Sequence, residues 1–222
     1  NMPQGITLKG DVNKERLVRC FEKLIVRHES LRTLFAMIGG EPKQQVMSRI
    51  DFSMEYYSSD QSELPVVIEA FVRPFNLSIG PLIRVGLVQI SSEEHILLVD
   101  MHHIITDGVS QRLLIKDFMA LYNNEKLGEI KVQYKDYSEW QQGTDQRENL
   151  YKRKAFWMQE FSEGPTILNL PTDFSRPLVG IDKGNTIGFS LTREETKWLK
   201  VFSVEEGATI FITVLSIFNV LL

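Results

Sequence analysis

The middle of the chain holds two apolar runs that predict neighbouring strands, LIRVGLVQI at residues 82–90 and HILLVDMHH at residues 95–103. The polar segment SSEE between them predicts a turn. Further strand-like runs are GITLKG and LRTLFAMI, and GGEPKQQVMSRI predicts a turn with a return strand. Because these runs alternate with helical segments, we expect an α/β (α+β sandwich) fold, a mixed sheet flanked by helices.

Several segments carry the caps or the periodicity of helices. Asn13 is a good N-cap for a helix that reaches about His28, and Pro65 opens a short helix to about Val72. A helix from about Ser110 to Tyr122 is expected to turn apolar side chains inward: Leu113, Leu114, Phe118, Leu121 and Tyr122. Two further helices are expected at residues 136–142 and 151–161, and a strand at 185–191. Thr192 and Glu195 have the spacing of a capping box at the start of another helix, and an apolar helix is expected at 208–222.

The turn-rich segment LPTDFSRPLVGIDKG predicts a linker between two lobes. Residues 1–175 are expected to form the first lobe, and residues 176–222 the linker and the start of a second, truncated lobe. The apolar segment 208–222 is too short for a membrane span, so no membrane is expected. A helix that is apolar on all sides normally lies inside a larger protein, and we expect its packing partner to be missing from the sequence.

Composition narrows the partners and the compartment. Of the 222 residues, 43% are hydrophobic, which is enough for a sizeable core, and the formal net charge is −4. The lysines and arginines form no basic stripe, so nucleic acid is not an expected partner. The single cysteine, Cys20, is expected to be buried, which suits a reducing compartment. No signal-peptide pattern is visible, and a cytoplasmic location is expected.

The stretch MHHIITDGVS, which ends at Ser110, holds the side chains best suited to chemistry. Adjacent strand residues point to opposite faces, so one of His102 and His103 is expected to face a cleft and the other to pack behind it. This geometry argues against a shared metal ion, and no metal site is expected. Asp107 is expected to orient the loop through an ion pair, Gly108 to permit a tight turn or a close backbone approach, and Ser110 to cap the next helix.

Three motifs resemble those of a known family. HHIITDG resembles the HHxxxDG motif of chloramphenicol acetyltransferase-like acyltransferases, and MHHIITDGVS looks like the form found in condensation domains of nonribosomal peptide synthetases. RHESLRTLF resembles the family's upstream RHExLRTxF motif, and YKDYSEWQ its downstream YxDxxxW motif. LPTDFSRP resembles the segment that leaves the first lobe. The family's first motif and those of its second lobe are absent, so the likeness is to the N-terminal lobe and the opening of the C-terminal lobe.

The resemblance implies a chloramphenicol acetyltransferase-like fold in which two lobes form a V around a tunnel. It implies peptide-bond formation, in which the amine of an acceptor aminoacyl thioester attacks a donor acyl or aminoacyl thioester. Both substrates would arrive on phosphopantetheine arms, with no cofactor bound directly by the domain. The implied partners are donor and acceptor peptidyl carrier proteins, an adjacent adenylation domain and the missing C-terminal lobe. This chain would hold one wall of the tunnel and is expected to be inactive alone.

The same resemblance assigns roles within the motif. It implies that His103 is the catalytic residue and that Asp107 is a structural carboxylate paired with Arg27 or Arg32. We expect His102 to pack, and the backbone at Gly108 to approach the reaction centre. The downstream residues Tyr134, Asp136 and Trp140 are expected to pack and cap.

Three alternatives remain open on the sequence. An epimerisation domain shares HHxxxDG but often carries Trp after DGVS, where this chain has Gln111. A coenzyme A-dependent acyltransferase shares the motif too, although RHESLRTLF and LPTDFSRP favour the peptide synthetase branch. A noncatalytic lobe that docks carrier proteins is the alternative from a different functional class.

Overall fold

The computed structural model describes residues 1–165, 170, 172–175, 184 and 186–222. The chain divides into two compact units, Asn1–Lys154 and Ala155–Leu222, each described here by itself. This division falls inside a helix, α5 (Thr144–Glu160). The lobe boundary expected after residue 175 adjoins residues 176–183, which lie outside the described residues, and it stays a prediction.

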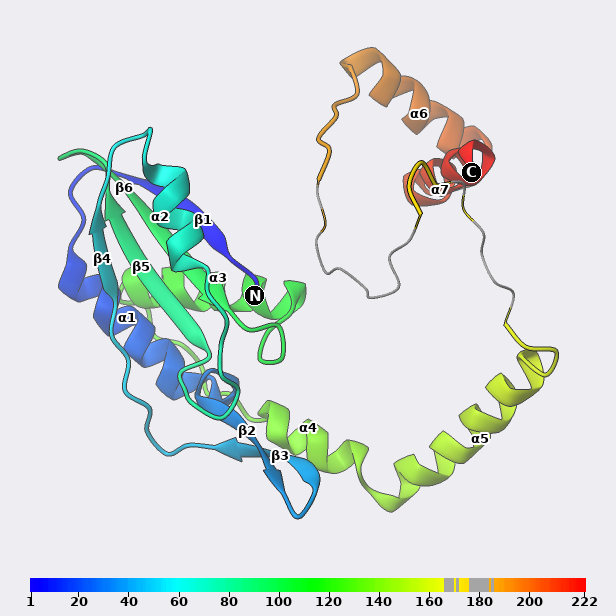
Figure 1. Cartoon of the computed structure of the whole chain (residues 1–222), viewed down its shortest axis with the longest axis horizontal. Helices are drawn as coiled ribbons and strands as arrows, with labels where there is room; N and C mark the ends of the chain where they lie inside the picture. The colour runs from blue at the N-terminus through cyan, green and yellow to red at the C-terminus, as the bar shows by residue number, and fades with distance from the viewer. Residues whose placement is uncertain (166–169, 171, 176–183, 185) are drawn as a thin grey trace. The chain divides into compact units, whose positions relative to one another are not determined.

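The first unit is built on a four-stranded mixed sheet in the order β1-β6-β5-β4 (Figure 1). Its strands are β1 (Gln4–Lys9), β4 (Glu55–Ser58), β5 (Ile83–Gln89) and β6 (Glu94–Met101). β6 runs antiparallel to both β1 and β5, whereas β4 runs parallel to β5. The predicted pair of central strands is therefore confirmed, and so is the mixed sheet.

A second sheet has two strands, β2 (Thr33–Ile38) and β3 (Glu41–Val46), joined by the tight turn at Gly39 and Gly40. Both glycines have positive φ (62° and 82°), a conformation that costs glycine little. The predicted strand and return strand are confirmed. β4 was not predicted, because its four residues (EYYS) are too few to show a pattern of their own.

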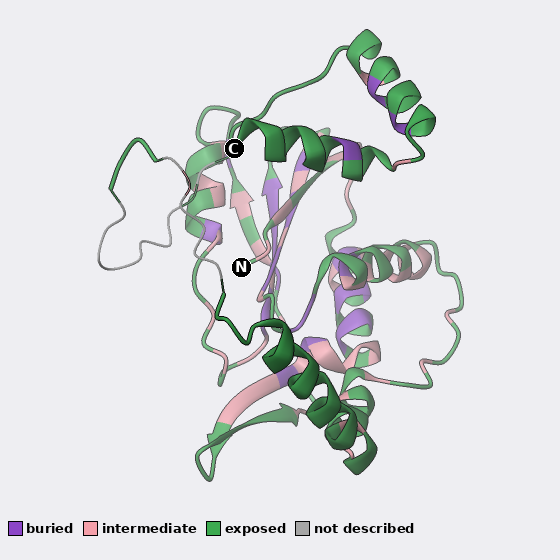
Figure 2. Cartoon of the chain, turned by 90° about the vertical axis from the view of Figure 1, so that its right-hand side faces the viewer, coloured by how far each residue is buried: buried purple, intermediate pink, exposed green. Residues whose placement is uncertain are grey.

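Helices cover both faces of the larger sheet (Figure 1). One face packs on α1 (Lys14–Arg27) and α3 (Gly108–Tyr122), and its core includes Ile83, Val85 and Leu87 of β5. The other face packs on α2 (Leu64–Phe71), with Val88 and Leu98 in its core. The alternation follows from the period of two in a strand. Buried residues accordingly lie on the central strands in Figure 2.

Local sequence signals set the ends of these helices. The Asn13 side chain accepts a hydrogen bond of 2.8 Å from the Arg16 amide and caps α1, as predicted. Pro65 stands in the first turn of α2. The Cα of Gly86 must lie close to Phe71, since a Cβ there would come within 2.9 Å of the Phe71 ring. Cys20 is buried in α1, and burial raises the pKa of its thiol.

Two expectations for α3 are wrong. The helix begins at Gly108 and its N-cap is Asp107, not Ser110. Leu114, Phe118, Leu121 and Tyr122 pack against the core as expected, but Leu113 is 55% exposed. A helix of this length turns only one stripe toward a sheet, and Leu113 lies beside that stripe.

The remaining helices are η1 (Glu29–Arg32), α4 (Tyr134–Gln141), α6 (Arg193–Glu205) and α7 (Ile210–Leu221). In the second unit, Thr192 and Glu195 form the predicted capping box of α6. The hydroxyls of Ser203 and Thr213 form a buried hydrogen bond of 2.8 Å that joins α6 to α7. Residues 186–191 are not a strand, contrary to expectation. A strand forms only by pairing with another, and the described part of this unit contributes none.

Among the described residues, no single helix is long and apolar enough to cross a bilayer. α6 and α7 satisfy the criteria of length and composition only together, as a pair bent by 102°.

Candidate active site

The two adjacent histidines follow the end of β6, in the turn that leads to α3. The amide of His102 donates to the Leu82 carbonyl at 3.0 Å and so extends the pairing of β5 with β6 by one bond. Nδ1 of His102 accepts a hydrogen bond of 3.0 Å from the Ile104 amide. The half-buried ring also lies edge-on to Phe75, with 6.3 Å between ring centroids. His102 therefore packs behind the site, as predicted, and its side chain also closes the turn.

The hydrogen bond at Nδ1 requires an unprotonated nitrogen, because a protonated Nδ1 has no lone pair to accept with. Burial lowers the pKa of His102, and the neighbouring His103 acts in the same direction, against Asp100. The neutral ring is thus the form that holds the turn closed.

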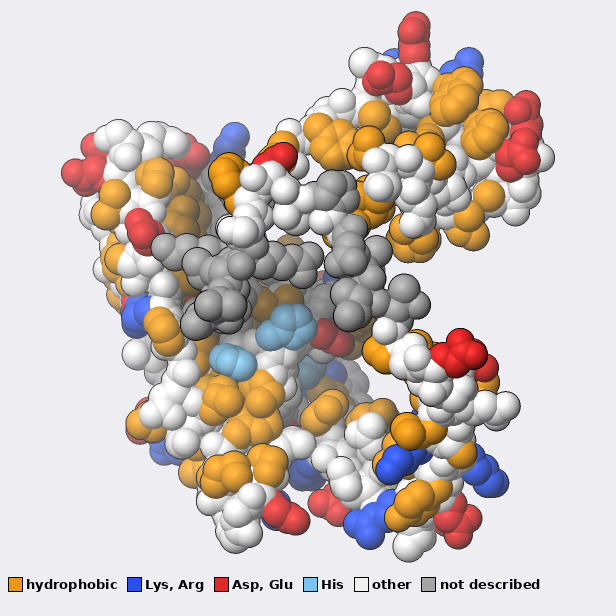
Figure 3. Space-filling model, turned by 45° about the vertical axis from the view of Figure 1, so that its right-hand side comes forward, with side chains coloured by type: hydrophobic (Ala, Val, Ile, Leu, Met, Phe, Trp, Pro, Cys, Tyr) orange, Lys and Arg blue, Asp and Glu red, His pale blue; other side chains and the backbone are white. Residues whose placement is uncertain are grey.

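His103 is exposed and lines a cavity of about 230 Å³ within the first unit. Histidine side chains (pale blue) reach the surface beside hydrophobic side chains (orange) in Figure 3. The cavity wall is drawn from η1, β2, β3, the start of α3 and α4, and its polar members include Glu29, Thr33, Gln44, Ser110, Tyr134 and Lys135. The expected division of labour between the two histidines is confirmed: one packs and the other faces a cavity.

Asp107 has a different role from the one expected. Its Oδ1 accepts hydrogen bonds from the Val109 amide (3.1 Å), the Ser110 amide (2.7 Å) and the Ser110 hydroxyl (2.7 Å). These donors lower the pKa of the Asp107 carboxyl, the Ser110 hydroxyl most of all. Asp107 thus caps α3, which also places its charge at the positive end of the helix dipole.

The predicted ion pair between Asp107 and Arg27 or Arg32 is wrong for this structure. Arg27 Nε donates to Asp117 Oδ2 at 2.8 Å, and Arg27 Nη1 donates to the Gly128 carbonyl at 2.6 Å. Arg32 pairs with Glu29 at 3.2 Å and also donates to the Met47 carbonyl. Both guanidinium groups are engaged elsewhere, while Asp107 folds back onto its own helix.

Glu29 organises one wall of the cavity. Its carboxylate lies 2.7 Å from Lys135 Nζ and 3.2 Å from Arg32 Nη2, and its side chain is 16% exposed. These contacts join the upstream motif to the downstream motif, although about a hundred residues separate them in the chain. Sequence reasoning quoted both motifs but did not single out Glu29 or Lys135. Their opposite charges, one in each motif, were the sequence signal that could have indicated this ion pair.

Gly108 is the first residue of α3, and a Cβ built on it would meet nothing within 4 Å. Its φ is not positive, so neither backbone conformation nor packing inside the described residues requires glycine there. The predicted tight turn does not explain this glycine. Close approach of another group to its backbone stays a prediction.

The downstream motif residues divide as follows. Asp136 completes a capping box with Gln133 at the start of α4, as predicted. Tyr134 lines the cavity and is 57% exposed, and Trp140 is 58% exposed on the same helix. Both rings do pack, as expected, but against Tyr137 of the same exposed helix, whose ring centroid lies 5.9 Å from that of Tyr134 and 5.5 Å from that of Trp140.

Comparison with known proteins identifies the family. The family model for the condensation domain matches residues 1–222, the whole chain. This chain belongs to the condensation-domain family. Bacitracin synthase 2 of Bacillus licheniformis is 42% identical over 222 residues, which are 100% of this chain and 8% of that protein. Gramicidin S synthase 2 of Aneurinibacillus migulanus is 37% identical over 222 residues, which are 100% of this chain and 5% of that protein.

Solved structures show the same condensation-domain fold. The X-domain from teicoplanin biosynthesis superposes with a TM-score of 0.82 at 22% identity, over 94% of this chain and 49% of that one. The condensation domain of the monacolin K polyketide synthase gives 0.71 at 19% identity, over 94% and 50%. An epimerization domain of tyrocidine synthetase gives 0.64 at 25% identity, over 78% and 42%. This condensation-domain chain therefore spans about half of the solved domains and a small part of the synthases.

Proposed function

We propose that this condensation-domain chain is one wall of a site that forms peptide bonds in a nonribosomal peptide synthetase. The observation that carries the proposal is His103, which is exposed on a cavity and held there by a turn that His102 closes. The whole-chain match to the condensation domain and the relatives among peptide synthases support the same reaction.

The reaction joins an acceptor amine to a donor thioester. The amine nitrogen attacks the thioester carbonyl and forms a C–N bond, the C–S bond breaks, and the donor's carrier thiol leaves. The nitrogen loses one proton, which the departing thiolate or the solvent takes up in the end. Both thioesters are carried on phosphopantetheine arms, so the arms are substrates and not a resident cofactor.

The role that suits His103 follows from the chemistry of the amine. A free α-amine has a pKa of about 7.7–8.0, so a useful fraction is already neutral near pH 7. Deprotonation before attack is then a small part of the barrier. His103 is better used to position the amine and to accept the proton from the zwitterionic tetrahedral intermediate. General acid–base help of this kind contributes roughly 10²–10⁴ in rate.

The proposed partners are donor and acceptor peptidyl carrier proteins, an adjacent adenylation domain, and the second lobe of the condensation domain. The multidomain relatives support partners of this kind. The buried free thiol of Cys20 supports a reducing, cytoplasmic setting.

A second candidate is a noncatalytic docking domain. A neighbour of the same fold was solved as a complex of the X-domain with OxyB, at a TM-score of 0.81 and 21% identity. The exposed His103 on its cavity favours the catalytic alternative, because docking alone makes no use of it.

The test uses the full-length protein that carries this chain, with donor and acceptor carrier proteins preloaded. Intact-protein mass spectrometry follows dipeptide transfer onto the acceptor. We expect transfer by the wild type. Binding of both carriers without transfer would favour the docking domain, and inversion of the carrier-bound residue without transfer would favour an epimerisation domain.

A further inference from the structure

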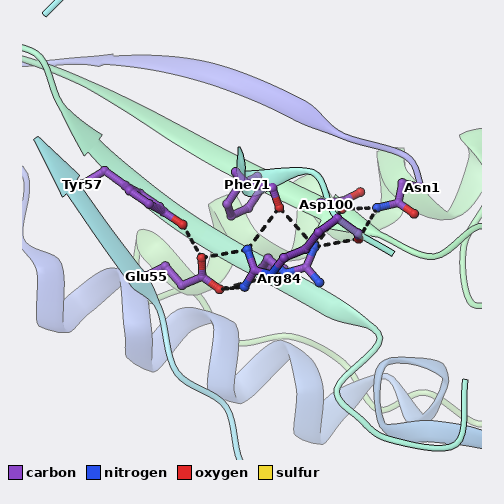
Figure 4. Close-up of polar contacts among 7 residues, drawn as sticks. Asn1, Glu55, Tyr57, Phe71, Arg84 and Asp100 are labelled. Carbon is purple, nitrogen blue, oxygen red and sulfur yellow. Dashed lines mark hydrogen bonds and ion pairs between the residues drawn. The ribbon is translucent and has the colours of Figure 1, made fainter. Parts of the chain in front are cut away.

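A buried ion pair joins Arg84 of β5 to Asp100 of β6 on the α2 side of the sheet, and Asp100 is three residues before His103. Arg84 and Asp100 occupy directly opposed positions of β5 and β6, and Arg84 Nη1 lies 3.2 Å from Asp100 Oδ2 (Figure 4). Asp100 is 0% exposed and the Arg84 side chain is 12% exposed. Oδ1 of Asp100 is buried without a hydrogen-bond partner among the described residues.

This burial is not explained by stability alone. Charges taken out of water lose hydration, and replacing a buried ion pair with apolar residues is often neutral or stabilising. The partly unsatisfied carboxylate of Asp100 makes the cost greater. The pair therefore calls for a role beyond holding β5 to β6, which the strand hydrogen bonds already do.

Arg84 also holds the segment that follows α2. Its Nη1 donates to the carbonyls of Phe71 and Arg73, each at 3.2 Å. Its guanidinium carbon lies 4.3 Å from the centroid of the Phe75 ring, which is cation–π geometry. Arg84 thus fixes both the backbone of this segment and the aromatic side chain at its end.

Phe75 connects Arg84 to His102. Its ring meets the His102 ring edge-on, with an interplanar angle of 80°. His102 in turn accepts the Ile104 amide at Nδ1 and closes the turn that carries His103. A continuous series of contacts therefore runs from Asp100 through Arg84, Phe75 and His102 to this turn.

We propose that Arg84 is a positioning residue for His103: Asp100 orients Arg84, Arg84 holds Phe75 against His102, and His102 fixes the turn that presents His103. The effect on the reaction rests on the proposed function, whereas the effect on His102 does not. Misplacing a reacting group by about 1 Å can cost about 10²-fold in rate, so small losses of order at Phe75 are expected to be visible.

The experiment compares Phe75→Leu and Arg84→Lys with the wild type in the full-length protein. Phe75→Leu keeps an apolar side chain but removes the aromatic ring that contacts Arg84 and His102. Arg84→Lys keeps the positive charge but removes the planar guanidinium with its several N–H donors. The first readout is nitrogen NMR of the His102 ring as a function of pH, which reports the tautomer and the titration. The second is the kcat and KM of dipeptide transfer.

The charged and titratable groups around His102 are His103, Asp100 and Arg84. We expect both variants to weaken the hydrogen bond from the Ile104 amide to His102 Nδ1. The ring then takes up a proton more easily, so its titration moves to higher pH. We expect kcat to fall by about tenfold to hundredfold with KM within twofold. The matched control is Tyr56→Leu, which also replaces an aromatic ring with Leu, on the neighbouring strand β4, where the ring is 52% exposed and lies near Lys14.

The outcomes separate the two proposals. The variants could melt at a lower temperature yet keep the wild-type His102 titration and the wild-type kcat. That result would show that the Arg84–Asp100 pair only stabilises the fold, and it would overturn the inference. If Arg84→Lys does not fold, Phe75→Leu still decides the matter. A shifted His102 titration in a protein whose wild type transfers nothing would uphold the positioning role and reject the proposed function.

Discussion

Oδ1 of Asp107 accepts a hydrogen bond of 2.7 Å from the Ser110 hydroxyl and another of 2.7 Å from the Ser110 amide. The aspartate of the HHxxxDG motif is therefore the N-cap of α3 in this structure. Because α3 starts directly after the turn that carries His103, the cap fixes the far end of that turn. This relationship changes what substitution at Asp107 should do.

We expect Asp107→Ala to lower the urea midpoint of unfolding, because the first amides of α3 lose their acceptor. Asp107→Asn and Asp107→Ser should recover most of the lost stability, since both side chains cap helices well. Equilibrium unfolding of the three variants measures this order. An Asn variant as unstable as the Ala variant would contradict capping and favour a role for the charge.

His103→Ala is expected to lower kcat for dipeptide transfer by about 10²-fold, the lower end of the range for a lost acid–base group. The melting temperature should stay close to the wild type, because the side chain is exposed. Glu93→Ala is the matched control, an exposed turn position at the opposite end of β6. A transfer rate within twofold of the wild type would reject a catalytic role for His103.

Gly108→Ala should fold as stably as the wild type, because a Cβ there meets nothing within 4 Å and the backbone φ suits any residue. We nevertheless expect slower transfer, since under the proposed function a substrate arm passes the start of α3 and the methyl group would enter that space. Melting curves and transfer kinetics together test this. Full activity with Gly108→Val would show that nothing approaches this backbone.

The cluster of Arg27, His28 and Asp117 predicts stability that depends on pH. Burial lowers the pKa of His28 from its ordinary 6.5 and outweighs Asp117. Burial opposes ionisation of Asp117, but hydrogen bonds from Arg27 and His28 prevail and lower its pKa from 3.8. Both groups bind a proton more weakly in the folded state than in the unfolded state. Stability is therefore complete above about pH 6.5 and falls with pH, first through His28 and below 3.8 through Asp117.

Urea unfolding at pH 7.5 and pH 5.0 measures the His28 part. The midpoint should be lower at pH 5.0 in the wild type, and His28→Gln should make the difference smaller, with a remainder from His102, whose pKa burial also lowers. Glu93→Gln, an exposed position, should leave the difference unchanged. An equal pH dependence in His28→Gln and the wild type would mean that another group controls it.

Much of the fold was predictable because its signals are local. The central hairpin of β5 and β6, the Asn13 cap of α1 and the capping box of Thr192 each depend on residues a few positions apart. The exchange of roles between Asp107 and Ser110 was missed because both residues are good caps, and only the backbone geometry chooses between them.

The sequence by itself determined the alternation of strands and helices, the family to which the motifs belong, and the two histidines at the end of a strand. Only the tertiary structure decided that Arg27 pairs with Asp117, that Glu29 meets Lys135, and that Arg84 faces Asp100. Hydrophobic periodicity and caps are read within one turn or one strand. An ion pair between distant residues depends on strand register and helix placement, which the packing of the whole unit sets and no short stretch encodes.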